Sequence, residues 1–180
     1  MNVTQTKLPG VLLIEPAVHA DERGFFIETF QAERYLDVAG IARQFVQDNQ
    51  ARSRRGVLRG LHLQRVQPQG RLVRVSRGEV FDVAADVDPE SPTFGQWVGT
   101  ILSDKNHHQL WIPPGYAHGY LVLSDFADFE YKCTDYHHAQ SEAGVAWNDP
   151  DLRIDWPLDN PTLSAKDRAL PTLAELTRRR

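Results

Sequence analysis

Short runs rich in valine, phenylalanine and tryptophan recur along this chain, and glycine, proline or aspartate breaks separate them. Runs of this length and composition are typical of β-strands. Only residues 33–41 and a segment after Ser164 suggest helices, and both are short. The sequence therefore predicts an all-β jelly roll or related double-sheet barrel with a few short peripheral helices, and it disfavours an alternating α/β fold. The nine runs are VLLIE, GFFIETF, VLRGLHLQ, RLVRVS, EVFDVAADV, QWVGTIL, QLWIP, GYLVLS and FEYKC.

The run EVFDVAADV has the clearest alternation of apolar and polar side chains. In a strand, Phe81, Val83 and Ala85 point to one face, whereas Asp82 and Ala84 point to the other. This pattern predicts a strand with one buried face and one polar face.

The charge balance and the cysteine content limit the classes of partner and compartment. The 20 Lys and Arg residues against 24 Asp and Glu residues give a net charge of −4, which argues against broad electrostatic binding of nucleic acid or of anionic membranes. The single cysteine, Cys133, cannot form an intrachain disulfide, and no run of about 18 apolar residues predicts a membrane span. The N-terminal residues lack the apolar segment of a signal peptide, so we expect a cytoplasmic protein.

The chain lacks the sequence signatures of several large enzyme classes. It contains no GxxxxGK[ST], GxGxxG, CxxC, HExxH or GxSxG motif. Among its seven histidines, His62 is followed at the next same-face position by Gln64, and the adjacent pairs at 107–108 and 137–138 are expected in loops. The close ligand spacing typical of metal sites is therefore missing, and we expect no metal.

Two histidines and an arginine nevertheless stand in apolar strand contexts. His62 lies in VLRGLHLQ and His118 in PPGYAHGY, and both are difficult to satisfy inside a small barrel without a polar cavity. On a regular strand Arg59 would face away from His62. Because glycine permits a β-bulge, we predict one at Gly60 that brings both side chains to the same cavity.

Other polar residues admit both a structural and a functional interpretation. Arg23, Arg59 and Arg71 are either scattered surface charges or ligands of a diphosphate. The stretch QDN at 47–49 has side chains able to bind a nucleobase or sugar. In LSAKD, Asp167 either completes a helix-capping box with Ser164 or orients His62, and the sequence alone favours the cap.

Taken together, nine motifs resemble the dTDP-4-dehydrorhamnose 3,5-epimerase family, in the same order and with compatible spacing from Leu8 to Leu170. The resemblance implies a single cupin-type jelly-roll domain over residues 1–180, with its core at about 8–170 and a C-terminal tail at 171–180. The terminal charge run TRRR is expected to be solvated. The resemblance also implies a homodimer that acts without cofactor or metal on a dTDP-4-dehydro-6-deoxy sugar. The motifs are DERGFFIETF, FVQDN, VLRGLHLQ, GEVFDVAADV, SPTFGQW, QLWIPPGYAHGY, EYKCTDY, WNDP and LSAKD.

The same resemblance implies roles for individual residues. His62 is the expected base, Asp167 its orienting partner, and Tyr131 the acid on the opposite side of the sugar. Arg71 occupies the position of a family lysine near the ketone oxygen. The implied substrate-binding residues are Arg23, Glu28, Gln47, Asp48, Asn49, Arg59, His118, Tyr136, Glu142 and Lys166, of which Arg23 and Glu28 are expected to cross to a partner subunit.

Three alternatives remain open at this point. A related enzyme that inverts only one carbon, or that isomerises the ketone, would use the same barrel. A metal-dependent cupin oxygenase is motivated by His62 and His118. A catalytically silent module that only binds a nucleotide sugar is disfavoured because the complete acid–base set is present.

Overall fold

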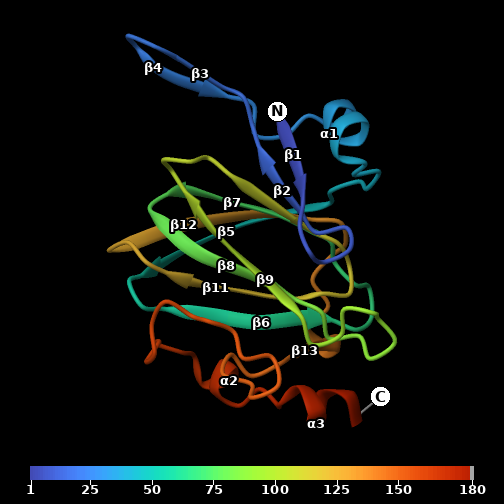
Figure 1. Ribbon diagram of the computed structural model, residues 1–180. Coiled ribbons are helices and arrows are strands. Elements are labelled where there is room, and N and C mark those ends of the chain that lie inside the picture. The colour runs from blue at the N-terminus through green and yellow to red at the C-terminus, as the bar shows by residue number, and fades with distance from the viewer. Residues whose placement is uncertain (179–180) are drawn as a thin grey trace.

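The computed structural model describes residues 1–178, and nearly all of its regular structure is β (Figure 1). One sheet has six strands in the order β1-β2-β10-β7-β12-β5, and the other has five in the order β13-β6-β11-β8-β9. The first sheet contains β1 (Asn2–Gln5), β2 (Leu12–Glu15), β10 (Gln109–Ile112), β7 (Arg71–Arg77), β12 (Phe126–Cys133) and β5 (Gln47–Arg54). The second contains β13 (Glu142–Gly144), β6 (Leu58–Gln64), β11 (Ala117–Val122), β8 (Glu79–Ala85) and β9 (Trp97–Ser103). All pairings in both sheets are antiparallel, which confirms the all-β double-sheet prediction.

Three apolar clusters form the layers. The central cluster lies between the sheets and joins Val73 and Phe129 of one sheet to Ala84 and Val122 of the other. A second cluster packs the outer face of the five-stranded sheet against the C-terminal segment, and a third packs the outer face of the six-stranded sheet against α1 (Ala32–Ala39). Side chains between the sheets thus lie in the interior of the barrel, where a polar residue requires a partner or a ligand.

Strand β8 corrects one prediction. Its side chains alternate as expected, but both faces are buried: Val83 and Ala85 pack in the outer cluster, whereas Val80 and Ala84 pack between the sheets. Asp82, expected on a polar face, is 0% exposed. The expectation of a half-buried strand was wrong because a second sheet covers the face that carries this carboxylate.

The helices lie where short helices were expected. Helix α1 ends at Gly40, whose φ of 67° is the left-handed conformation that glycine adopts readily. Helix α2 (Ala165–Arg168) begins after Ser164, and α3 (Leu173–Arg178) follows; a single 3₁₀ turn spans Ala139–Ser141. No helix among residues 1–178 is long and apolar enough to cross a membrane.

The C-terminal segment adds to the packed core. Leu173 and Leu176, which lie in the segment expected as a C-terminal tail, are 2% and 6% exposed and belong to the cluster beneath the five-stranded sheet. Their spacing of three residues places both on one face of α3. The packed core therefore continues past residue 170. Of the expected TRRR tail, Arg179 and Arg180 lie outside the described residues.

A two-stranded hairpin projects from the barrel. Within residues 1–178, strands β3 (Val18–Asp21) and β4 (Gly24–Ile27) pair with each other alone, and they extend away from both sheets (Figure 1). Phe25 and Phe26 on this hairpin are 60% and 67% exposed. Exposed aromatic side chains on an isolated hairpin are typical of a surface that another chain covers.

Candidate active site

A cavity of about 450 Å³ opens between the sheets, beside helix α2. Its lining comes from β5, β6, β7, β11 and β12 and from the segment at 162–167. The fold thus gathers residues that are widely separated in the sequence. The predicted site residues in this lining are His62, Tyr131, Asp167, Arg71, Arg59, His118 and Lys166.

The bulge predicted at Gly60 is present and explains how Arg59 and His62 share the cavity. His62 pairs with His118, and Arg59 pairs with Tyr120, so β6 has one more residue than β11 between these two pairs. Because directly opposed residues of antiparallel strands point to the same face, the extra residue turns Arg59 to the face of His62. Gly60 has a φ of +132°, and a Cβ there would lie 2.5 Å from the Gly119 Cα, so glycine is required.

His62 and Asp167 are in direct polar contact in the cavity. The His62 Nε2 lies 2.6 Å from the Asp167 Oδ1, although the two residues are 105 positions apart in the sequence. The Ser164 side chain caps α2 by accepting the Asp167 backbone N–H at 3.0 Å. The capping interpretation was therefore right for Ser164, but the Asp167 carboxylate binds His62, a contact that the sequence alone disfavoured.

His62 is unprotonated and has one ring nitrogen available as a base. Burial lowers the pKa of His62 below its usual value, against the opposing effect of Asp167. The ring is therefore neutral near pH 7, with its Nε2–H donated to Asp167. Its Nδ1 makes no hydrogen bond to any residue within 1–178 and is free to accept a proton in the cavity.

A second histidine–aspartate pair joins His118, in the cavity lining, to the fully buried Asp82. The His118 Nε2 lies 2.9 Å from Asp82 Oδ2, and both side chains are nearly inaccessible. The other ring nitrogen, Nδ1, faces Arg71 Nη1 at 3.4 Å. Both nitrogens of His118 therefore have protein partners.

Arg71 and Tyr131 supply a cation and a protonated phenol. The guanidinium carbon of Arg71 lies 6.0 Å from the centroid of the Tyr131 ring. Burial raises the pKa of Tyr131, against the opposing effect of Arg71, so the phenol keeps its proton near neutral pH. The cavity therefore contains an available base, an available acid and a positive charge.

An ion pair stands at the rim. Lys166, in α2, forms an ion pair with Glu142 in β13, and the His137 ring lies 3.7 Å from the same carboxylate. Burial alone would raise the pKa of Glu142, but the hydrogen bond and charge of Lys166, with smaller effects of His62 and His137, lower it overall. Glu142 is thus held as an anion next to the entrance.

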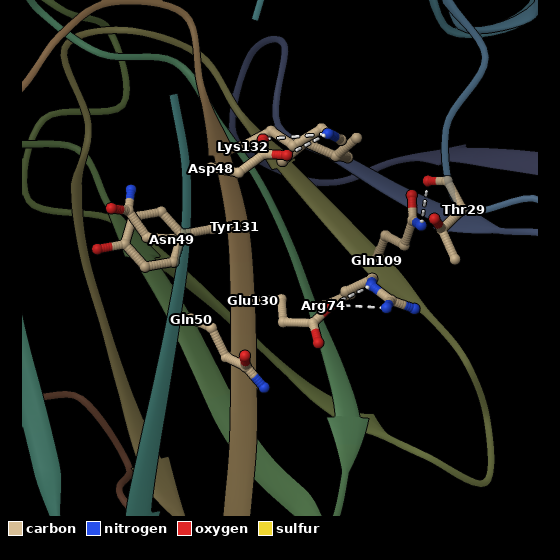
Figure 2. A pocket seen from close by; sticks show the side chains of 10 residues that line it. Thr29, Asp48, Asn49, Gln50, Arg74, Gln109, Glu130, Tyr131 and Lys132 are labelled. Atoms are coloured by element: carbon tan, nitrogen blue, oxygen red, sulfur yellow. Dashed lines mark hydrogen bonds and ion pairs between the residues drawn. The ribbon is translucent and has the colours of Figure 1, made fainter. Parts of the chain in front are cut away.

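The remaining predicted residues lie outside this cavity in the single chain. Gln47 donates to Asn49 Oδ1 at 3.0 Å, while Asp48, on the opposite face of β5, pairs with Lys132 at 2.9 Å. A shallow cavity of about 330 Å³ lies there, lined by Asp48, Asn49 and Tyr131 among others (Figure 2). Figure 2 also shows that Lys132 and Asp48 approach each other from neighbouring strands.

Tyr136 and the hairpin residues are exposed. The Tyr136 side chain is 61% exposed, and the residue contributes its backbone oxygen to Gln64. Arg23 pairs with Asp21 at the hairpin tip, and Glu28 pairs with Arg34. None of these three predicted residues lines the cavity of its own chain.

Sequence reasoning missed Tyr120 and Ser53. Tyr120 lines the cavity, and Ser53 accepts a hydrogen bond from Arg59 Nε at 3.0 Å. Tyr120 follows His118 by two positions, so alternation along β11 was a signal that could have found it. Within residues 1–178, no group of three or more His, Cys, Asp or Glu side chains is arranged to hold a metal ion.

Comparisons with known proteins agree with this chemistry. The family model for dTDP-4-dehydrorhamnose 3,5-epimerase matches residues 5–175. A relative of that name from Pseudomonas aeruginosa is 54% identical over 169 residues, which cover 93% of each chain. The crystal structure of dTDP-6-deoxy-D-glucose-3,5-epimerase from Legionella pneumophila in complex with dTDP-4-keto-L-rhamnose is 56% identical, with a TM-score of 0.94 over 97% of this chain and 96% of that one.

A third similar protein has a narrower activity. The 3'-monoepimerase ChmJ from Streptomyces bikiniensis, solved in complex with dTDP-quinovose, is 33% identical, with a TM-score of 0.90 over 96% of this chain and 88% of that one. The fold and the acid–base cavity define a cupin-type jelly-roll enzyme of the isomerase class. More particularly, the chain belongs to the dTDP-4-dehydrorhamnose 3,5-epimerase family.

Proposed function

We propose that this chain inverts C-3 and C-5 of dTDP-4-dehydro-6-deoxy-D-glucose to give dTDP-4-dehydro-L-rhamnose, in dTDP-rhamnose biosynthesis. The observation that carries the proposal is the free Nδ1 of His62, in a cavity that also holds Tyr131 and Arg71. Both carbons flank the C-4 ketone, so removal of either proton gives an enolate. Catalysis of this step needs a base, an acid on the opposite face and positive charge near the developing oxyanion.

Each inversion uses the same three groups. His62 Nδ1 takes the proton from the carbon, and the electron pair of the broken C–H bond moves into the enolate, whose negative charge lies on the C-4 oxygen. Arg71 stabilises that charge. Tyr131 then gives its proton to the opposite face of the carbon while the ketone reforms, and proton exchange with water returns His62 and Tyr131 to their starting states. Asp167 stabilises the imidazolium between these steps.

Hydrogen exchange at the two carbons tests this reaction. We expect purified protein in deuterated water to introduce deuterium at both C-3 and C-5 of the keto sugar, as followed by NMR. The main alternative is epimerisation of a single carbon, which the likeness to a monoepimerase supports. Label at only one carbon would establish that alternative, and absence of label would leave a protein that only binds the sugar nucleotide.

The acid–base mechanism also separates this proposal from a metal-dependent oxygenase. We expect turnover to persist after treatment with a chelator, and elemental analysis to find no stoichiometric iron. Iron at one atom per chain, with loss of turnover on its removal, would contradict the proposal. The free thiol of Cys133 agrees with a reducing compartment, and we place the reaction in the cytoplasm.

We further propose a homodimer in which each active site uses residues from both subunits. Arg23 and Glu28 lie on or beside the projecting hairpin and do not line their own cavity, and Phe25 and Phe26 leave that hairpin apolar and exposed. Docking of the hairpin on a second copy would bury these rings. It would also bring Arg23 to the part of the partner's active site that binds the diphosphate of the substrate.

Mixing two inactive variants tests the composite site. In an equimolar Arg23→Ala and His62→Ala mixture, half of the dimers combine both chains, and one of their two sites has every native residue. Activity should therefore recover to about a quarter of the wild-type value, as symmetric exchange predicts. A monomer in analytical ultracentrifugation, or no recovery despite mixed dimers, would contradict the composite site.

A further inference from the structure

Two buried side-chain polar atoms have no hydrogen-bond partner among the described residues, and they are the Arg71 Nε and the Tyr120 hydroxyl. Both side chains line the cavity that contains His62. A buried hydroxyl without a partner is costly in an interior that otherwise satisfies its polar groups. Its position in the active-site cavity indicates that a ligand supplies the missing partner.

The Tyr120 ring is held firmly in place. It stacks on Phe129 with ring centroids 3.9 Å apart and an angle of 13° between the planes, and the residue is 5% exposed. Tyr120 lies directly opposite Arg59 across the β6–β11 pair, at the end of the bulge away from His62. The hydroxyl is therefore a fixed group that belongs to the Arg59 side of the cavity.

The surrounding groups define what kind of ligand atom the hydroxyl binds. Arg59 and Arg71 have only donors, so neither accepts the phenolic proton. The Ser53 hydroxyl is close enough to affect Tyr120, but it receives Arg59 Nε at 3.0 Å and makes no hydrogen bond of normal geometry with the Tyr120 hydroxyl. Asp82, the neighbour of Tyr120 on β8, already receives the His118 Nε2 at 3.2 and 2.9 Å from its two oxygens. The missing partner is thus an acceptor, and the Arg59 guanidinium favours an anionic one. Within residues 1–178 the hydrogen bond of the Arg59 side chain is from its Nε to Ser53, which leaves its terminal nitrogens for the same anion.

We propose that the Tyr120 hydroxyl donates a hydrogen bond to a diphosphate oxygen of the substrate, next to the oxygens that Arg59 binds. This inference rests on the proposed function, because it takes a nucleoside diphosphate sugar as the ligand. Tyr120 is then a substrate-binding residue that fixes the distance between the phosphate end of the cavity and the base.

The variant Tyr120→Phe tests this role because it removes the hydroxyl and keeps the stacked ring. Loss of a hydrogen bond to a charged oxygen should raise the Kd for dTDP, measured by calorimetry, by about 10- to 100-fold. The same contact is present in the ground state and the transition state. The variant should therefore have a lower kcat/KM because its KM rises, while its kcat stays close to that of the wild type. The melting temperature of the ligand-free variant should not fall, because the hydroxyl has no hydrogen bond to another residue within 1–178 to lose.

Tyr116→Phe is the matched control. The Tyr116 hydroxyl donates to the Pro9 carbonyl at 2.8 Å, and Tyr116 does not line this cavity. We expect its Kd for dTDP and its turnover to equal those of the wild type.

Three results would overturn the inference. An unchanged Kd for dTDP in Tyr120→Phe would remove the hydroxyl from diphosphate binding. A fall in kcat without a change in Kd would place its action at the sugar instead, and a lower melting temperature of the free protein with unchanged Kd would indicate a purely structural role. In each case wild-type epimerisation would stand; wild-type protein that binds no dTDP would instead overturn the proposed function as well.

Discussion

Two histidine–aspartate pairs, each with its histidine in the cavity lining, have the same composition but differ in exposure and in the hydrogen bonds of the histidine. In the His118–Asp82 pair the side chains are 6% and 0% exposed, whereas in the His62–Asp167 pair they are 23% and 6% exposed. Among the residues that the structure describes, His118 has partners on both nitrogens, and His62 has one on Nε2 alone. A histidine that must accept a proton needs one unoccupied nitrogen, and only His62 has it.

The two pairs also differ in how the fold assembles them. His118 and Asp82 lie on neighbouring strands of a single sheet, so sheet pairing alone sets their contact. Asp167 reaches His62 from α2, outside both sheets. The comparison suggests that the first pair holds Arg71 in position and stabilises the interior, while the second carries out proton transfer.

The largest effect expected on turnover is that of His62→Ala. Removal of the proposed base should lower kcat by about two to four orders of magnitude, while dTDP still binds. Steady-state assays and calorimetry with dTDP would measure the two quantities. Near-normal kcat would assign proton abstraction to another group and would remove the functional distinction between the two pairs.

Asp82→Ala should have the largest effect on folding. It leaves the His118 Nε2–H without an acceptor in the interior, and we expect the free energy of unfolding to fall by about 3 kcal/mol. Asp167→Ala should cost less in a denaturant titration, because His62 is partly exposed to the cavity. Equal losses would mean that both pairs serve the same structural purpose.

Asp167→Asn should reduce turnover by about 10- to 100-fold, as expected for the loss of a group that orients a histidine. Asp167 raises the pKa of His62 against the lowering effect of burial. His62 acts in its neutral form, so kcat/KM falls as the pH drops through its pKa. In the variant that pKa is lower still, and the acidic limb of the pH–rate profile should move to lower pH. A limb that moves to higher pH would contradict this electrostatic role.

Ser164→Ala provides the smallest expected effect and the control for Asp167→Asn. It removes the cap of α2 but keeps the carboxylate, so we expect a loss of about 1 kcal/mol in unfolding free energy. The kcat should remain close to that of the wild type. A fall in kcat as large as that of Asp167→Asn would mean that the helix cap, and not the carboxylate, is the important element.

The architecture could be predicted from the sequence where strands bury apolar side chains. All nine apolar runs contain or overlap strands. Strand β5, with the sequence QDNQARSR, was missed because one of its faces carries exposed ion-paired residues such as Arg52, which binds Asp128 at 2.6 Å. Sheet pairing, not side-chain burial, makes this segment a strand, and pairing partners cannot be read from one strand alone.

The sequence predicted many of the residues that line the candidate site, but it did not predict all of the contacts between them. A bulge was inferred because Arg59 and His62 had to share a face and Gly60 allowed it. The sequence alone could not predict the contact of Asp167 with His62 in place of a role in the helix cap. In the structure Asp167 does both: its backbone N–H binds Ser164, and its carboxylate binds His62. The Tyr120 hydroxyl was missed because only the packed structure reveals that it has no protein partner.

The bulge at Gly60 makes the active site depend on a count of residues. Arg59 and His62 share a face only because one surplus residue stands between them. Deleting Gly60 would leave Arg59 and His62 two positions apart on a regular strand, where they would still share a face. A strand that kept all of its residues but lost the bulge would instead turn Arg59 or His62 away from the cavity, because positions three apart point to opposite faces. The number of residues and the bulge must therefore change together if both side chains are to stay in the cavity.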